Sequence, residues 1–279
     1  MIVKQVYGTV QSRSLTIDAA GLRADEMDID VSGLLKIGKP NADYSSGIYG
    51  GPKDPRLIDI AAGDVQMFGT GGIVLQKEGV NEVYGGKIKL DVARNLIIDN
   101  NTISTRGYYK NDNNNVAVGG IEISAANMRL QNNAKIDLPA GSVPEGIEVG
   151  GLSVEVRNIL QINNSTISAS VEGARSLRAD VSLAAMILEL NAAKLEHVGY
   201  FSEVYNLGDR YLRDVDEPVF LTGHGKLSLN AGSILAANTG THIEIHNGTL
   251  ELGGQVVSMD GITLNSVTDW QAGEAESTL

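Results

Sequence analysis

Residues 150–169 read GGLSVEVRNILQINNSTISA, and this stretch decides the fold. Apolar residues occupy every second position from Leu152 to Val156 and again at Leu160 and Ile162. An alternation of this kind has the period of a β-strand. The Asn-rich segment 163–165 separates these residues from a third short alternating stretch that begins at Thr166. The stretch therefore predicts three short strands joined by tight corners.

The same arrangement recurs along the chain. Glycine pairs open it at 85–86, 119–120 and 150–151. A shorter phrase, in which two apolar residues flank small or amide residues, occurs at 17–22, 60–65, 98–103, 130–136, 162–167, 190–195, 229–234 and 245–250. Short strands cannot each bury a face alone, but stacked repeat units bury a continuous core. We predict an all-β fold, a single right-handed parallel β-helix over residues 1–279 with its clearest repeats at 85–173.

Stacking places equivalent residues on one another. The inward columns are predicted to contain Ile98, Ile103, Ile121, Ile123, Leu130, Ile162, Ile167, Leu190 and Leu229. Corners need residues that tolerate a left-handed backbone, and Asn, Asp and Gly adopt it at the lowest cost. The corner amides are Asn100, Asn101, Asn132, Asn133, Asn163 and Asn164. They either form an interior or corner ladder or cap turns that face solvent, and both alternatives are structural.

Composition narrows the function classes. Lys and Arg total 22 against 34 for Asp and Glu, and the net charge of −12 disfavours nucleic-acid partners. The absence of cysteine excludes disulfides, thiolate metal sites and cysteine nucleophiles. The most apolar stretch, 183–195, is interrupted by polar residues and is shorter than the ~20 residues that span a membrane. We expect no nucleic-acid partner and no membrane insertion, and the first ten residues show no leader.

The glycine pair, the alternating strand, the Asn-containing second strand and the NNxTIxA phrase resemble the repeats of filamentous-haemagglutinin-type proteins. The resemblance is clearest from Gly85 to Gly173. Members of that group are large secreted bacterial adhesins, exoproteins and surface proteins. The resemblance implies a secreted or cell-surface location, a structural or adhesive role, and a host or matrix glycan or protein as partner.

Three insertions interrupt the repeat at 41–56, 107–118 and 199–223, and they hold most of the tyrosines. Loops at the corners of a solenoid can carry recognition without disturbing the stack. The candidate ligand-binding residues are Tyr108, Tyr109, Tyr200, Tyr205 and Tyr211. The alternative is that tyrosine rings in these loops lie flat on the coil surface and seal it.

Metal and cofactor motifs are weak. His242 and His246 flank the alternating segment 243–245, and a strand would place them on one face about 13 Å apart. The loop residues Asp209, Asp214, Asp216 and Glu217 offer oxygen ligands for calcium, but Arg210 and Arg213 interrupt them. A solvated acidic face is the alternative. We expect no metal and no cofactor.

A carbohydrate-active enzyme is the competing function, because polysaccharide lyases and hydrolases also use parallel β-helices. The charged residues that could gather for such chemistry are Asp91, Arg94, Asp99, Lys135, Asp137 and Arg157. Any solvated strand face carries such charges, so we predict a non-catalytic module. A phage tail-spike or fibre segment is a further alternative.

A β-helix has an unpaired strand edge and an apolar cross-section at each end. Neither the start, 1–7, nor the finish, 271–279, has the pattern of an amphipathic cap. We therefore predict that the chain associates end to end with copies of itself or continues into flanking repeats.

Overall fold

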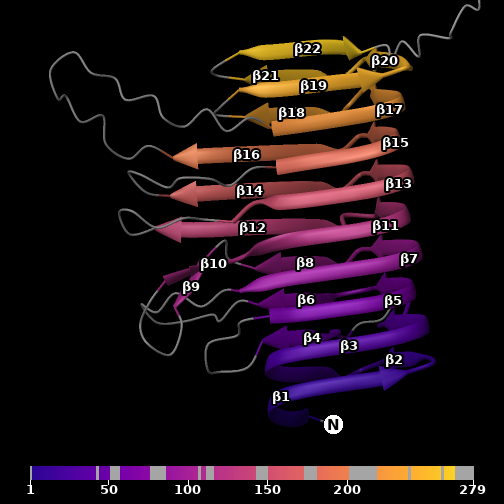
Figure 1. The fold of residues 1–279 in the computed structure, drawn as a ribbon, viewed down its shortest axis with the longest axis vertical. Coiled ribbons are helices and arrows are strands. Elements are labelled where there is room, and N and C mark those ends of the chain that lie inside the picture. Colours follow the sequence, from indigo (N-terminus) through magenta and orange to yellow (C-terminus); the bar gives the residue numbers. More distant parts are fainter. Residues whose placement is uncertain are drawn as a thin grey trace, which may run out of the picture.

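The computed structural model describes residues 2–41, 44–50, 57–75, 86–105, 108–110, 116–142, 150–172, 181–200, 219–237, 240–258 and 261–267. Regular structure in these residues is entirely β-strand, and the strands stack along one axis (Figure 1). The described residues contain no helix with the length and apolar character needed to cross a membrane. The chain is all-β and forms a parallel β-helix, as the repeat predicts.

Two kinds of strand alternate along the chain. The long strands are β1 (Ile2–Ser12), β3 (Gly21–Ile37), β5 (Leu57–Phe68), β7 (Lys87–Asp99), β11 (Gly120–Gln131), β13 (Leu152–Asn163), β15 (Val181–Asn191) and β17 (Val219–Leu229). The shorter strands between them are β2 (Leu15–Ile17), β4 (Ser46–Gly50), β6 (Gly71–Leu75), β8 (Thr102–Thr105), β12 (Lys135–Ser142), β14 (Thr166–Glu172), β16 (Lys194–Tyr200) and β18 (Ile234–Ala237). The last described coils consist of β19 (Thr241–His246), β20 (Thr249–Leu252), β21 (Gln255–Ser258) and β22 (Ile262–Val267).

Each coil has three faces, which we call A, B and C. In one coil, face A is 87–92, face B is 95–99 and face C is 102–105. Faces A and B belong to one long strand. In the pairing of β7 with β11, the register shifts between Ala125 and Asn127 of β11, where face A passes into face B. Every pairing between coils is parallel, and equivalent faces pair throughout, as in Ile88 with Ile121 and Ile121 with Leu152. The predicted first and second strands of each unit are thus one long strand bent at this irregularity.

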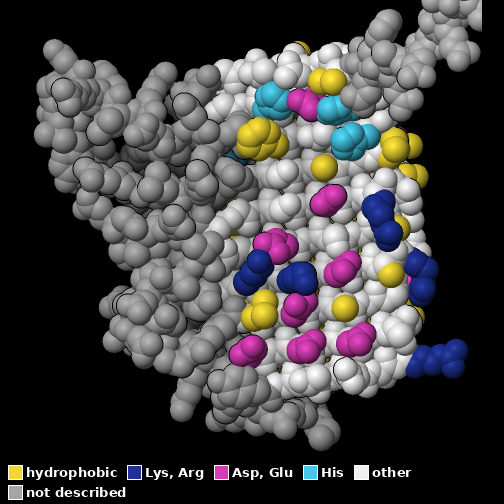
Figure 2. All heavy atoms as spheres, viewed as in Figure 1, with side chains coloured by type: hydrophobic (Ala, Val, Ile, Leu, Met, Phe, Trp, Pro, Cys, Tyr) yellow, Lys and Arg dark blue, Asp and Glu magenta, His cyan; other side chains and the backbone are white. Residues whose placement is uncertain are grey.

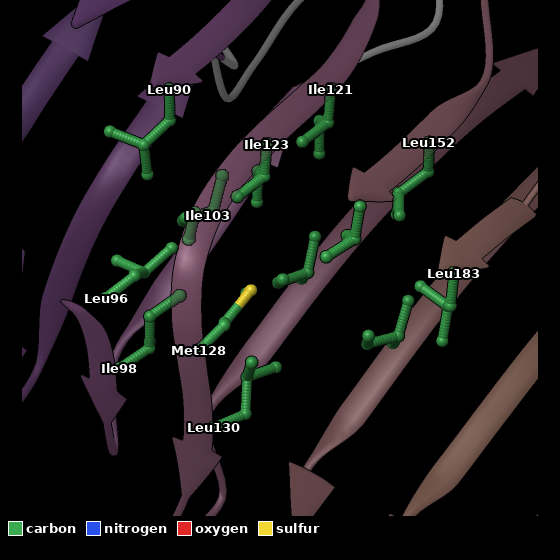
Figure 3. Close-up of a cluster of buried hydrophobic side chains, with 14 of the residues drawn as sticks. Leu90, Leu96, Ile98, Ile103, Ile121, Ile123, Met128, Leu130, Leu152 and Leu183 are labelled. Carbon is green, nitrogen blue, oxygen red and sulfur yellow. The ribbon is translucent and has the colours of Figure 1, made fainter. Parts of the chain in front are cut away.

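The core is the set of inward columns (Figure 3). Along face A the inward residues Leu90 and Ile123 belong to neighbouring coils in the same column, as do Leu96 and Met128 on face B. All nine residues predicted to point inward are buried, each at most 3% exposed. Because alternate residues of a strand point to opposite faces, period two is enough to predict this core.

The corner between faces B and C takes a left-handed residue in successive coils. Asn100, Asn132 and Asn164 have φ values of 52°, 57° and 44°, and Ala192 has 47°. Next to this residue a buried column runs through Asn101, Ala134, Ser165, Ala193 and Ser233. Asn101 Nδ2 donates to the carbonyls of Phe68 and Gly69 at 3.2 and 3.1 Å, while Asn163 and Asn191 belong to a lateral amide ladder. Asn101 and Asn163 therefore match the interior or ladder alternative, whereas Asn100, Asn132, Asn133 and Asn164 are exposed at the turn.

Some boundaries differ from those expected. The phrases at 60–65 and 245–250 lie at the bend between faces A and B, not at the corner before face C. Ile234 is 36% exposed and Leu235 takes the inward position, because the corner that contains Gly232 is one residue longer there. Strand β4 lies inside the predicted insertion 41–56, and 219–223 inside the predicted insertion 199–223 belongs to β17. Within 107–118 the strands β9 (Tyr108–Lys110) and β10 (Val116–Val118) pair antiparallel.

Ile162→Asp tests the inward column against Ile159→Asp on the same strand. Ile162 is 1% exposed, whereas Ile159 is 37% exposed and points outward. The first change buries an unpaired carboxylate, and we expect it to lower the free energy of unfolding by about 4 kcal/mol or more. The second should change it by less than about 1 kcal/mol. Urea unfolding of both variants measures this, and a normally stable Ile162→Asp would contradict the fold.

Candidate functional site

The tyrosines that the sequence nominates are placed only in part. Tyr108 and Tyr109 lie in β9, paired with Val118 and Ala117 of β10, and Tyr200 ends β16 opposite Glu172. The side chains of these three residues lie outside the described part of the structure. Tyr205 and Tyr211 lie outside the described residues, as do the calcium candidates Asp209, Asp214, Asp216 and Glu217.

Two other tyrosines of the predicted insertions have structural contacts. The Tyr49 ring lies against the backbones of Gly21 and Gly47, so that a Cβ on Gly47 would come within 2.7 Å of its Cζ. Arg23 lies over the same ring, with its Cζ 5.5 Å from the ring centroid, and burial raises the pKa of Tyr49. For Tyr49 the sealing role is therefore the one observed.

Tyr44 links two successive corners between faces B and C, because it lies between β3 and β4 and contacts Asp18 between β2 and β3. Its hydroxyl donates to Asp18 Oδ1 at 2.6 Å, and Lys39 pairs with Asp18 Oδ2. The hydrogen bonds from Lys39 and then from Tyr44 lower the pKa of Asp18. Asp18 is thus held by two structural partners.

The six charged residues considered for an enzyme lie on different faces. Asp91 is on face A, Asp99 ends face B, and Lys135 and Asp137 are on face C and pair with each other at 2.9 Å. Arg94 and Arg157 lie at the bend between faces A and B. The structure therefore does not bring the six together as one catalytic group.

The bend region contains a shallow depression of about 420 Å³, which Asp91, Ser124, Glu155 and Arg157 help to line. Three of its polar side chains make hydrogen bonds within the coils. Ser124 Oγ donates to Asp91 Oδ1 at 2.7 Å, and Arg157 Nη2 donates to the carbonyl of Ala93 at 2.5 Å. The first contact joins adjacent coils, and the second spans two coils, from β13 to the end of face A in β7.

A histidine cluster, formed by His224, His242, Glu244 and His246, lies on face A near the end of the described coils. Figure 2 shows the three histidines around one carboxylate near the top of the face. Alternation in β19 turns His242, Glu244 and His246 outward, since Thr241, Ile243 and Ile245 between them are buried. Pairing of β17 with β19 then brings His224 next to His246, with ring centroids 5.0 Å apart.

Hydrogen bonds define the centre of this cluster. Glu244 Oε2 lies 3.2 Å from His242 Nε2, and its other oxygen contacts His246 Nε2. Hydrogen bonds from His242 and then from His246 lower the pKa of Glu244. Phe220 lies beside the His242 ring, with centroids 5.7 Å apart. The described residues contain no group of three or more His, Asp or Glu side chains placed to hold a metal ion.

No protein-family model matches this sequence, and neither the curated proteins nor the solved structures contain a significant match to the chain. The fold and the contacts of the described side chains therefore carry the functional argument.

The histidine cluster makes a pH-dependent prediction. A lowered folded-state pKa means that Glu244 stabilises the fold above its ordinary value of 4.5, and that this stabilisation is lost as the pH falls through the lowered value. Glu244→Gln should therefore lower the melting temperature at pH 7, and this effect should become smaller as the pH falls from 4.5 to 3. Thermal melts across this range measure the difference.

The matched control repeats Glu244→Gln in a chain that also carries His242→Gln and His246→Gln. Without the imidazoles the pH-dependent part of the effect should disappear, because they are its named cause. An equal effect at pH 3 and pH 7 in the otherwise unchanged chain would contradict the assignment.

Proposed function

We propose that this chain is a non-catalytic structural or adhesive module that acts on a cell surface or outside the cell. The observation that carries the proposal is the use of polar side chains to join one coil to the next. Asn191 Nδ2 donates to Asn163 Oδ1 at 2.8 Å, and Asn230 Nδ2 donates to Asn191 Oδ1 at 2.6 Å. Three successive coils are thus connected by one amide ladder on face B.

Charged residues are used in the same way. Asp64 accepts from Arg94 Nη2 at 2.6 Å and from Asn95 Nδ2 at 2.9 Å, both in the next coil, and these contacts lower its pKa. Gln161 Nε2 donates to Glu189 Oε2 at 2.9 Å one coil further on. An active site instead keeps titratable groups converging on a pocket. Side chains committed to neighbouring coils favour a scaffold.

The adhesive part of the proposal rests on where the repeat admits insertions. From β4 onward, a segment of varying length connects face C of one coil to face A of the next, from 238–240 between β18 and β19 to the much longer 201–218 between β16 and β17. A rigid column that presents variable segments along one edge suits attachment to glycans or proteins. The filamentous-haemagglutinin-type resemblance supports the same role and a secreted or surface location.

Attachment can be tested with polystyrene beads coated with the purified chain. We expect the beads to bind at least one member of a panel of mammalian glycans and extracellular-matrix proteins. Tyr108→Ala with Tyr109→Ala should reduce bead binding at least about tenfold and leave the melting temperature nearly unchanged, because β9 and β10 pair outside the coil ladders. Tyr44→Ala with Tyr49→Ala is the matched control, since it removes two tyrosines with coil contacts.

The control pair should lower the melting temperature and leave binding unchanged. The adhesive proposal fails if no surface in the panel binds the beads, or if the two tyrosine pairs have the reverse effects. Incubation with neutral and acidic polysaccharides tests the catalytic alternative directly. Release of new reducing ends by the unchanged chain would overturn the non-catalytic assignment.

A further inference from the structure

The upper end of the described coils has a free edge on each face. Its strands are β20 on face B, β21 on face C and β22 on face A (Figure 1). Each of these strands pairs with a coil below it, and the described residues place no strand above it. Ile262 and Leu264 continue the inward columns of Thr241 and Ile243, yet they are 47% and 52% exposed.

Exposed apolar side chains gather at this end. Of the seven large apolar side chains that are exposed among the described residues, four lie on β20, β21 and β22. They are Leu252, Val257, Ile262 and Leu264. Leu252 also continues an inward column, since it pairs with the buried Leu229. An apolar cross-section is therefore open at the upper end.

The lower end has the complementary edges. Residues 2–5 of β1 lie on face C, residues 7–12 of the same strand lie on face A, and β2 lies on face B. Among the described residues each of these segments pairs only upward, and the inward-facing Val10 and Leu15 are half-buried. Both ends thus expose strands of the same three faces, A, B and C. The strands at the two ends run in the same direction around the coil.

We propose that a second copy of this chain occupies the upper end, head to tail, so that β1 of the second copy pairs with β22 and β21 of the first. Continuing the columns sets the register. Ile262 would face Gly8, Leu264 would face Val10 and Ser266 would face Ser12, because these residues stand in the columns of Met27, Ile29 and Val31.

The register fits the side chains that are present. Large Leu264 and Ile262 meet the smaller Val10 and Gly8, and the backbone pairing is parallel, as it is in every pairing between coils of this chain. On face B the proposed contact leaves space for one more strand, ~4.8 Å high, between β20 of the first copy and β2 of the second. Two upper ends facing each other would instead join strands antiparallel.

A head-to-tail contact does not close on itself, so it produces open chains of copies rather than a fixed dimer. The contact is independent of the adhesive role proposed above. Loss of self-association would leave the adhesion of single copies intact, and loss of adhesion would leave the assembly intact. The bead assay and the assembly assay therefore fail separately.

Sedimentation velocity of the full chain over a wide concentration range tests the proposal. We expect a concentration-dependent series of oligomers. Leu264→Lys blocks the upper end and Val10→Asp the lower end, and each should weaken association at least tenfold, because an unpaired charge enters an apolar contact. Val257→Lys is the matched control. Val257 is 56% exposed on the same last coil, but it pairs with the outward-facing Ala236 and should leave association unchanged.

Mixing the two blocked variants gives the sharpest test. Leu264→Lys keeps a normal lower end and Val10→Asp keeps a normal upper end, so an equimolar mixture should form heterodimers and nothing larger. If Val10→Asp does not fold by circular dichroism, excess Leu264→Lys added to the unchanged chain serves instead. It should cap the assemblies and shorten them.

Three results would overturn the proposal. The first is that the unchanged chain stays monomeric at the highest concentration reached. The second is association that Leu264→Lys abolishes but a folded Val10→Asp does not affect, which indicates contact between two upper ends. The third is association that appears only after removal of residues 268–279, which would make that segment the occupant of the upper end.

Discussion

Parallel backbone pairing between successive coils is the interaction on which the rest of this structure depends. No coil has a core of its own, because one coil is only one strand thick along the axis. Ile88, Ile121 and Leu152 exclude water only as a column, and the column exists only while the ladders keep their register. A shift by one residue would turn every inward side chain outward. Register and core therefore specify each other.

The polar surface follows from the same constraint. Identical faces repeat along the axis, so like charges would stack directly on one another if each coil used the same residues. Asp28 and Asp59 do pair in this way on face A. Elsewhere the chain places acceptors beside donors, as in Asp64 beside Arg94 and Asp99 beside Gln131, or it uses amides, which serve as both. Asn163, Asn191 and Asn230 show the second solution. Polar groups at the surface thereby reinforce the register that the core requires.

The sequence predicted the parts of the fold that depend on local pattern. Period two identified inward residues such as Ile123 and Leu190, and amide or glycine clusters identified the corners. The phrase at 229–234 ends one residue too early, because a single extra corner residue makes Leu235 rather than Ile234 the inward residue. Only part of the histidine cluster could be predicted from the sequence. Alternation places His242 and His246 on one face with Glu244 between them, but His224 joins only through the pairing of β17 with β19.

The direction of the ladders also determines how the molecule responds to force. Backbone hydrogen bonds between coils run roughly along the axis, so tension between the two ends pulls on them directly rather than shearing whole strands. An end coil has one neighbour and an interior coil has two, so the ends yield first. The repeat from Ile88 to Ile121 holds 33 residues, and a coil of that length releases roughly 110 Å of extended chain. Under load this column would lengthen in discrete increments, one coil at a time, while the remaining coils stay folded.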